Sequence, residues 1–451
     1  MNTDISIRET RAAPRRTSIL ESVRASEIGA FFDPTQTSAE NGTASVLSST
    51  INLCNTLMGT GMLAMPTVIA VSGWIPGLVL LFLMCFCNIF TVEVVFRLCR
   101  IAGPPTSLSE IGDKAAARGS IVIDLAVALN CIGVASSYVI ISTGNFYYTF
   151  GGPRSVWVLV TIAIATPLAF IKDMDSLRHT SFAAVAILLY IVVLVAVYAI
   201  IGTCDGDKSN GEYCPPGETA VATDFVGALR SFGEMGTLGV RIPPIYNEMD
   251  TPTPERCTKV NGMGFGLVTS LYVTVAVCGY YTFGDITPSN IIDAYPNNAP
   301  VAVARVGLSL VVIFSYPIMV FGESKDSRDV SLVSRLTLKS VAIPEDRNRR
   351  DLLPLRTYSC GSKFETKRRR VVITLSFIAF TTLIGLVLTD IGIVVDLVGS
   401  VCGSMISFAF PCWAYYMLFP EQRKSPFSII ASVLFVLGLV LIPLGVTLTV
   451  L

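Results

Sequence analysis

The residues of this sequence that could do chemistry inside a membrane lie in one stretch, Asn55-Thr56-Leu57-Met58-Gly59-Thr60-Gly61-Met62-Leu63-Ala64-Met65-Pro66. It belongs to an apolar run from Val46 to Val71, and about 20 such residues suffice to cross a bilayer. Glycine and proline weaken a helix, and a backbone group that loses its partner in lipid costs several kcal/mol. Because such a break is tolerated only beside protein or water, the stretch predicts a binding site at mid-membrane; the alternative is a simple kink at closely packed small residues.

A break at Gly59-Thr60-Gly61 would supply binding groups for ligands of either charge. Freed amide groups and the N-terminus of the following half-helix can hold an anion, and freed carbonyl groups can hold a cation. The hydroxyl groups of Thr56 and Thr60 could bind a ligand there, or they could donate to carbonyl groups of their own helix.

The composition places these residues in an all-α integral membrane protein. The chain has 451 residues, of which 52% are hydrophobic and 15% are charged, and its mean hydropathy is +0.63. Residues 46–451 are predicted to form the membrane domain. We expect eleven transmembrane helices, approximately over 48–70, 76–97, 121–149, 155–171, 181–201, 222–242, 260–283, 300–321, 371–390, 393–418 and 426–450.

The distribution of lysine and arginine predicts the orientation of these spans. With the N-terminus in the cytosol, 28 basic residues fall on cytosolic segments, whereas only Arg154 and Lys208 fall on the opposite side. Three more, Arg230, Arg241 and Arg305, lie in spans or at their edges. An odd number of spans then places the C-terminus outside the cell or in the lumen of an organelle.

The segments outside the spans carry three further expectations. Residues 1–45 are predicted to be a disordered cytosolic tail, because they are polar and charged. Residues 322–370 form a basic cytosolic loop, which either anchors the orientation or contacts anionic lipid. The outer loop 202–222 contains Cys204 and Cys214, which could form a disulfide in an oxidising compartment.

The sixth span is unusually polar, since it contains Arg230, Glu234 and Arg241. A charge at mid-bilayer costs at least about 2.5–3.5 kcal/mol, so these side chains must face protein or water. Ser231 and Glu234 flank the expected break of this span. Glu234 could select a cationic substrate, take up a coupled proton, or form a structural pair with Arg230, which lies four residues earlier on the same helix.

Spans one and six also share a spacing. Gly59-Thr60 precedes Pro66 by seven and six residues, and Gly236-Thr237 precedes Pro243 by the same numbers. Interrupted spans at corresponding places in two halves are typical of transporters built from inverted repeats, whose site lies at the repeat interface.

Other functional classes fit less well. Equal numbers of basic and acidic residues, 33 of each, indicate no nucleic-acid partner. The sequence offers no zinc-type cysteine pairs and no catalytic triad, and its single histidine leaves little for acid–base chemistry, so we expect neither an enzyme nor a cofactor other than a coupling ion. Among carboxylates, Glu93 is expected to be solvated or paired. Asp396 is expected to cap a helix or be solvated, with outer gating as the alternative.

Several motifs, taken in order, resemble the amino acid/auxin permease family. They are Asn55-x-x-x-Gly59-Thr60-Gly61-Met62-Leu63-x-x-Pro66 with Gly73-Trp74, Ser137-Tyr138-Val139-Ile140-Ile141, Ile242-Pro243-Pro244-Ile245-Tyr246-Asn247-Glu248-Met249, Gly279-Tyr280-Tyr281-Thr282-Phe283-Gly284, Ser315-Tyr316-Pro317 and Leu397-Val398-Gly399-Ser400. The resemblance implies a LeuT-type fold, in which ten helices form two inverted repeats of five and an eleventh follows. It also implies secondary active transport of amino acids, coupled to a sodium or proton gradient, in a plasma membrane or a vacuolar or lysosomal membrane.

The same resemblance implies roles for individual residues. Gly59, Thr60 and Gly61 match the unwound segment that holds the substrate carboxylate, and Tyr138 in the third-helix motif is a further substrate-binding candidate. Asn55 and Ser315 match positions proposed for sodium. Family members are usually more apolar in span six, so the charges there make cationic amino acids a candidate substrate class. A sensor that binds an amino acid and signals through its cytosolic segments is the alternative function.

Overall fold

The computed structural model describes residues 42–104, 106–116, 119–170, 178–201, 242–321, 363–388 and 391–450. The residues of the sixth span for which the sequence predicts roles, Arg230, Ser231, Glu234 and Arg241, lie outside these ranges. So do Cys204, Cys214 and most of the tail and the basic loop; the nine cysteines of the described ranges are all free thiols, so nothing in them supports a disulfide.

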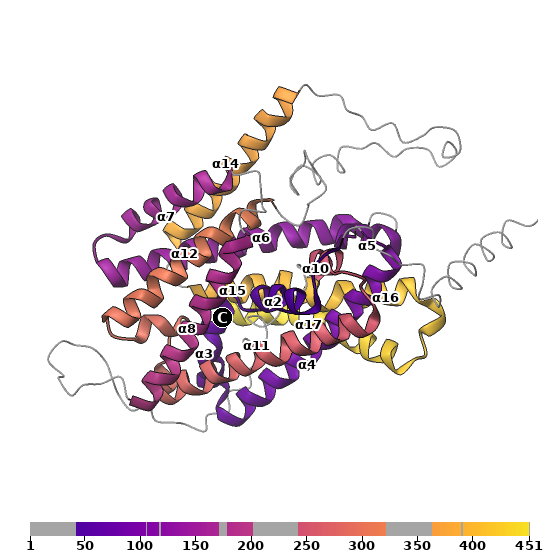
Figure 1. Cartoon of the computed structure of the whole chain (residues 1–451), viewed down its shortest axis with the longest axis horizontal. Coiled ribbons are helices and arrows are strands. Elements are labelled where there is room, and N and C mark those ends of the chain that lie inside the picture. Colours follow the sequence, from indigo (N-terminus) through magenta and orange to yellow (C-terminus); the bar gives the residue numbers. More distant parts are fainter. Residues whose placement is uncertain are drawn as a thin grey trace, which may run out of the picture.

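The described chain is helical throughout, apart from one isolated β-bridge (Figure 1). Its elements, in order, are α2 (Val46–Leu57), η1 (Thr60–Ala64), α3 (Met65–Ser72), α4 (Trp74–Ala102), α5 (Leu108–Ala115), α6 (Gly119–Phe150), α7 (Arg154–Ala169), α8 (Arg178–Ile201), α10 (Ile242–Glu248), α11 (Pro254–Phe283), η5 (Gly284–Ile286), η6 (Ile291–Ala294), α12 (Ala299–Phe321), α14 (Lys363–Val387), α15 (Ile391–Val398), η8 (Gly399–Gly403), η9 (Met405–Ala409), α16 (Phe410–Leu418), η10 (Pro420–Gln422) and α17 (Pro426–Val450).

These helices confirm a multi-pass membrane protein. Within the described ranges, seven helices are long and apolar enough to cross a membrane, and α2 with α3 forms a further span that is bent by 55°. The helices α7 and Thr374–Val387 within α14 are apolar but shorter. The count of eleven spans remains a prediction, because most of the sixth lies outside the described residues.

Two helices begin six or more residues earlier than hydropathy predicts. Helix α11 starts at Pro254 rather than at residue 260, because the hydroxyl of Thr253 accepts a hydrogen bond from the Arg256 amide at 3.4 Å and caps it. Helix α14 starts at Lys363, inside the predicted loop 322–370. Lysine and arginine are good helix formers, so a basic segment can continue a membrane helix into the aqueous phase.

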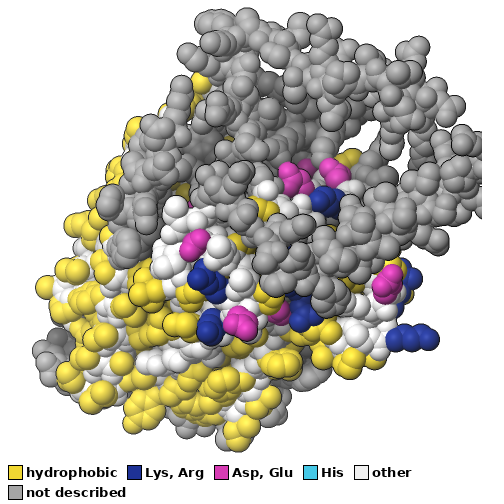
Figure 2. Space-filling model, turned by 45° about the vertical axis from the view of Figure 1, so that its right-hand side comes forward, with side chains coloured by type: hydrophobic (Ala, Val, Ile, Leu, Met, Phe, Trp, Pro, Cys, Tyr) yellow, Lys and Arg dark blue, Asp and Glu magenta, His cyan; other side chains and the backbone are white. Residues whose placement is uncertain are grey.

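The outward surface of the helices is largely apolar, as contact with lipid requires. Figure 2 shows apolar side chains over much of the described surface, with the charged ones gathered in its centre and on its right. Large exposed hydrophobic residues follow one another along single helices, for example Val79, Phe82 and Phe86 on α4, and Val433, Val436 and Val440 on α17. A monomeric soluble protein rarely exposes so continuous an apolar surface.

The broken span α2–α3 lies near the middle of the view in Figure 1 and packs along α11. Small residues permit this close approach. A Cβ at Gly264 would lie 2.7 Å from the Leu53 side chain, and one at Gly279 would lie 2.6 Å from the Pro66 ring. Elsewhere, α6 packs against α12 more extensively than any other pair of described helices, and it also contacts α7 and α14.

At one end of the molecule, the chain is already ordered before α2 begins. The Ala44 amide donates to the Glu248 carbonyl at 2.9 Å, and the Asp250 amide donates to the Ala44 carbonyl at 2.9 Å. Residues 42–45, which sequence composition assigned to the disordered tail, are therefore held against the end of α10. Composition misses this contact because its hydrogen bonds involve backbone atoms only.

The corner between α5 and α6 offers a test of the packing. A Cβ at Gly119 would overlap the backbone carbonyl of Gly112, whereas a Cβ at Gly144 in the same helix would meet no described atom within 4 Å. We expect Gly119→Ala to lower the stability of the purified protein by about 1–3 kcal/mol and Gly144→Ala to leave it unchanged, measured by thermal unfolding in detergent. Equal melting temperatures for the two variants would contradict this packing.

Candidate functional site

The first span breaks where the sequence predicts. Helix α2 ends at Leu57, and Gly59 is extended, with φ −104° and ψ −166°. A 3₁₀ turn then begins at Thr60 and leads into α3, where Pro66 occupies the first turn. Proline is accommodated there because the amide it lacks would have had no partner inside the helix.

The break is stabilised by a side chain that sequence reasoning missed. The hydroxyl of Tyr272, on α11, donates to the Leu57 carbonyl at 2.6 Å, and the Gly59 amide donates to the same oxygen at 2.9 Å. Both lone pairs of this freed carbonyl are therefore satisfied within the protein. The only sequence signal was a tyrosine in the middle of an apolar span, where its hydroxyl needs a partner.

On the other side of the break, donors remain available. The first hydrogen bond of the half-helix joins the Met62 amide to the Gly59 carbonyl at 3.3 Å. The amides of Thr60 and Gly61 come before it and so have no acceptor within their own helix. A Cβ at Gly59, the residue before these amides, would meet no described atom within 4 Å, so there is room next to Gly59.

The polar residues of α2 near the break behave differently from one another. The Thr56 hydroxyl donates to the Asn52 carbonyl at 2.9 Å, which is the alternative that the sequence left open for it. Asn55, two residues before the end of α2, is half-buried.

Tyr138 and Ser315 lie on α6 and α12, the pair of helices that packs most extensively. Tyr138 is half-buried and packs against the apolar core. The Ser315 hydroxyl donates to the Val311 carbonyl of its own helix at 2.9 Å. The hydrogen bonds of Ser315 do not join it to the break, so its place in the site, like that of Tyr138, stays a prediction.

The tenth span contains a feature that hydropathy could not reveal. Two π-helical segments, η8 and η9, interrupt it between Gly399 and Ala409. Such wide turns are frequent at functional sites. Asp396, three residues before the first of them, is only 3% exposed, so the expectation that it is solvated is wrong. The neighbouring Ser400 hydroxyl donates to the Asp396 carbonyl at 2.6 Å.

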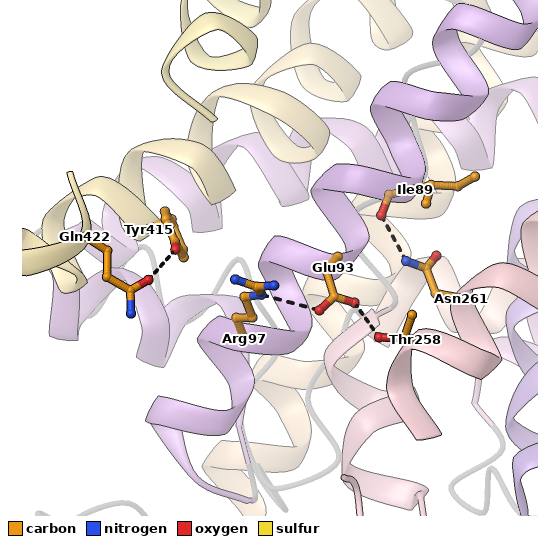
Figure 3. A network of polar contacts seen from close by, with 7 residues as sticks. All are labelled: Ile89, Glu93, Arg97, Thr258, Asn261, Tyr415 and Gln422. Atoms are coloured by element: carbon orange, nitrogen blue, oxygen red, sulfur yellow. Dashed lines mark hydrogen bonds and ion pairs between the residues drawn. The ribbon is translucent and has the colours of Figure 1, made fainter. Parts of the chain in front are cut away.

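A polar network joins α4, α11 and the α16–η10 segment near the Glu248 end of the molecule. Figure 3 shows its residues, which are Ile89, Glu93, Arg97, Thr258, Asn261, Tyr415 and Gln422. Glu93 pairs with Arg97 at 3.4 Å and accepts from the Thr258 hydroxyl at 3.3 Å, so the expectation that it is solvated or paired is confirmed. The Arg97 guanidinium also lies 3.9 Å from the centre of the Phe427 ring, which links α4 to α17.

The Tyr272 contact can be tested directly. Tyr272→Phe removes the hydroxyl and leaves the Leu57 carbonyl one hydrogen bond short in a buried site, so we expect a loss of about 1–3 kcal/mol in stability. Tyr281→Phe is the matched control, because Tyr281 is on the same helix and is 66% exposed. Thermal unfolding of both variants in detergent gives the comparison, and equal stability would exclude the contact.

Comparisons with known proteins agree with this architecture. A family model described as "Transmembrane amino acid transporter protein" matches residues 42–451. Vacuolar amino acid transporter 5 of Schizosaccharomyces pombe is 27% identical over 397 residues, which cover 85% of this chain and 87% of that one. The mouse sodium-coupled neutral amino acid transporter 7 is 24% identical over 434 residues, covering 90% and 86%.

Among solved structures, the Eremococcus coleocola manganese transporter has a similar fold, with a TM-score of 0.54, 11% identity and coverage of 92% of this chain and 89% of that one. At that identity the likeness concerns the fold alone, and it agrees with an all-α membrane transporter. The relatives are transporters and not enzymes, and they lend no support to the sensor alternative. Since the family model spans nearly the whole sequence, the chain belongs to the transmembrane amino acid transporter protein family.

Proposed function

We propose that this chain moves an amino acid across its membrane by alternating access and binds it at the break between Leu57 and Gly61. The observation that carries the proposal is the broken first span. There the Leu57 carbonyl of the first half-helix accepts from Tyr272, while the Thr60 and Gly61 amides of the second half-helix have no acceptor within their own helix.

The substrate carboxylate suits these amides. Amide groups at the start of a helix carry a partial positive charge and bind anions. In residues 60–72, which form η1 and α3, the amides of Thr60 and Gly61 are the donors without an acceptor in the helix. They bind the carboxylate that all α-amino acids share, while the side chain of the substrate lies elsewhere in the site, toward Tyr138 and the sixth span with Ser231 and Glu234.

The transport is driven by a sodium or a proton gradient. If sodium is the coupling ion, its ligands are the side chains of Asn55 and Ser315. Asn55 is half-buried near the end of α2 and carries an amide oxygen. The Ser315 hydroxyl donates a hydrogen bond to the Val311 carbonyl, which leaves its oxygen lone pairs to accept a cation. Oxygen ligands of this kind suit hard cations.

Alternating access follows from two groups of helices in a LeuT-type arrangement of two inverted repeats. Helix α11 packs against α2, α3 and α4, whereas α6 packs against α7, α12 and α14. The first group rocks against the second and exposes the break to each side in turn. Similarity to a vacuolar relative supports a vacuolar membrane as its location, and a lysosomal or plasma membrane is the alternative.

The substrate site is tested by filling the open space at the break. Gly59 has a φ of −104°, which alanine tolerates, so Gly59→Ala should fold normally. Its methyl group would displace the substrate carboxylate, and we expect KM to rise at least tenfold. Gly262→Ala on α11, where a Cβ also meets nothing within 4 Å, is the control. Radiolabelled uptake into proteoliposomes measures both, and an unchanged KM for Gly59→Ala would place the substrate elsewhere.

The coupling ion is tested by the same uptake assay, run with a panel of neutral and cationic amino acids under a sodium gradient and separately under a proton gradient. If sodium drives uptake, Asn55→Ala should raise the sodium concentration for half-maximal rate at least tenfold, because it removes one ligand. An unchanged sodium dependence would exclude Asn55 as a ligand. Uptake driven only by protons would exclude the sodium site altogether.

A further inference from the structure

Four uncharged polar side chains of α6 and α7 are buried without a hydrogen bond to any described residue. They are Ser142, Thr143 and Asn145 on α6 and Thr161 on α7, and none of them is more than 2% exposed. Neither the three hydroxyl groups nor the amide nitrogen and oxygen of Asn145 have a partner within the described chain. Buried polar groups are hydrogen-bonded as a rule, so these four residues, which we call the α6–α7 polar cluster, point to a partner of another kind.

Hydroxyl groups elsewhere on the same two helices show the usual alternative. Each of the following four donates to a carbonyl of its own helix at 2.7–2.8 Å: Ser136, Ser137, Thr149 and Thr166. This bond is open to serine and threonine throughout a helix. The three hydroxyl groups of the α6–α7 polar cluster do not make it, and they are therefore placed for another partner.

The register of the two helices brings these hydroxyl groups to one level. Helices α6 and α7 are joined by the short turn 151–153 and pack against each other as an antiparallel pair. The ring of Trp157 on α7 lies against that of Phe146 on α6, with ring centres 5.6 Å apart. One turn further along α7 is Thr161, and one turn back along α6 are Ser142 and Thr143. Although they are level, no two of them are hydrogen-bonded to each other, as a bridging molecule between them requires.

Asn145 adds an amide group to the hydroxyl groups, because it follows Ser142 by three residues and so lies on the same face of α6. Each hydroxyl can donate once and accept twice, whereas the amide offers two N–H donors and a carbonyl oxygen. The α6–α7 polar cluster therefore needs both donors and acceptors. The charged residues of the two helices, Asp124 and Arg154, lie at least seven residues from it along the chain.

A ligand that both donates and accepts satisfies all of these groups. A cation would bind the oxygens and leave the amide N–H groups without an acceptor, and an anion would leave the amide oxygen without a donor. Either ion would also be buried far from an opposite charge on these helices, which is costly in a membrane. Water meets both needs, and a buried water molecule typically makes about three hydrogen bonds to polar groups that lack other partners.

We propose that the α6–α7 polar cluster is a binding site for buried water, which joins the two helices by hydrogen bonds that their side chains do not make directly. Such bridges are nearly as favourable in enthalpy as direct hydrogen bonds. The site is separate from the break between Leu57 and Gly61, and the inference does not depend on the proposed function.

A double-mutant cycle on the full-length protein, read by thermal unfolding in detergent, measures the bridge. Asn145→Leu and Thr161→Val replace a polar side chain by an apolar one of similar size. Because bound water loses a partner in each variant, we expect each to lower the melting temperature by about 2–5 °C. Since both changes remove the same bridge, the double variant should lose less than the sum of the two.

Thr166→Val is the control for the cycle, because the Thr166 hydroxyl donates within α7 at 2.7 Å and needs no water. Its effect should add to that of Asn145→Leu. Unchanged or raised melting temperatures for Asn145→Leu and Thr161→Val would show that the cluster is dry, since replacing unpaired polar groups by apolar ones relieves their burial. Strictly additive losses would exclude a shared ligand. Either result would overturn the proposal.

Electron cryomicroscopy of the unmodified protein in nanodiscs tests the site without any variant. We expect density for water within hydrogen-bonding distance of both Asn145 and Thr161. Direct hydrogen bonds within the cluster, with no density between its members, would overturn the proposal. Melting temperatures in sodium chloride and in choline chloride distinguish water from an ion, and we expect them to be equal. A sodium-dependent rise that Asn145→Leu removes would identify a cation instead and would also overturn the proposal.

Discussion

Backbone hydrogen bonding in lipid is the constraint on which the rest of this structure depends. A membrane helix can stop at mid-bilayer only if its freed groups find partners, and here the stop after Leu57 is met by the Tyr272 hydroxyl. That contact requires α11 to approach closely, which Gly264 and Gly279 permit. The Leu57 carbonyl is thus satisfied by protein, whereas the amides of Thr60 and Gly61 have no acceptor within their own helix. The polarity of the site therefore follows from the way the break is stabilised.

Hydrogen bonds at both ends of the broken span join it to other parts of the protein. Ala44, before α2, makes two backbone hydrogen bonds, and the Asn52 side chain within α2 donates to the Glu248 carboxylate at 3.4 Å. After the break, the Thr67 hydroxyl donates to the Pro288 carbonyl at 2.9 Å. Each such bond contributes about 0.5–1.5 kcal/mol. Apolar packing adds to them, since Met65, Val68 and Ile69 of α3 are buried.

Hydropathy and helix-breaking residues predicted most of the fold, because lipid requires apolar spans and restricts where a helix can break. The spans lie near their expected positions, and the break falls at the Gly-Thr-Gly stretch. The predicted helix boundaries were wrong where polar residues extend a helix, as at the starts of α11 and α14, Pro254 and Lys363. Of the predicted site, the structure describes the break along α2, whereas the roles of Tyr138 and Ser315 stay predictions and Ser231 and Glu234 lie outside the described residues. Partners from distant helices leave no trace in local sequence. The Tyr272 contact, the burial of Asp396 and the hydrogen bonds of Arg305 were found only through tertiary contacts.

The central claim is that the substrate carboxylate binds the amides that follow the break. A structure of the purified protein, determined by electron cryomicroscopy in nanodiscs with a saturating concentration of a transported amino acid, tests it most directly. We expect density for the ligand beside Gly59, with its carboxylate within hydrogen-bonding distance of the Thr60 and Gly61 amides. Ligand density in another part of the molecule, with the break unoccupied, would contradict it.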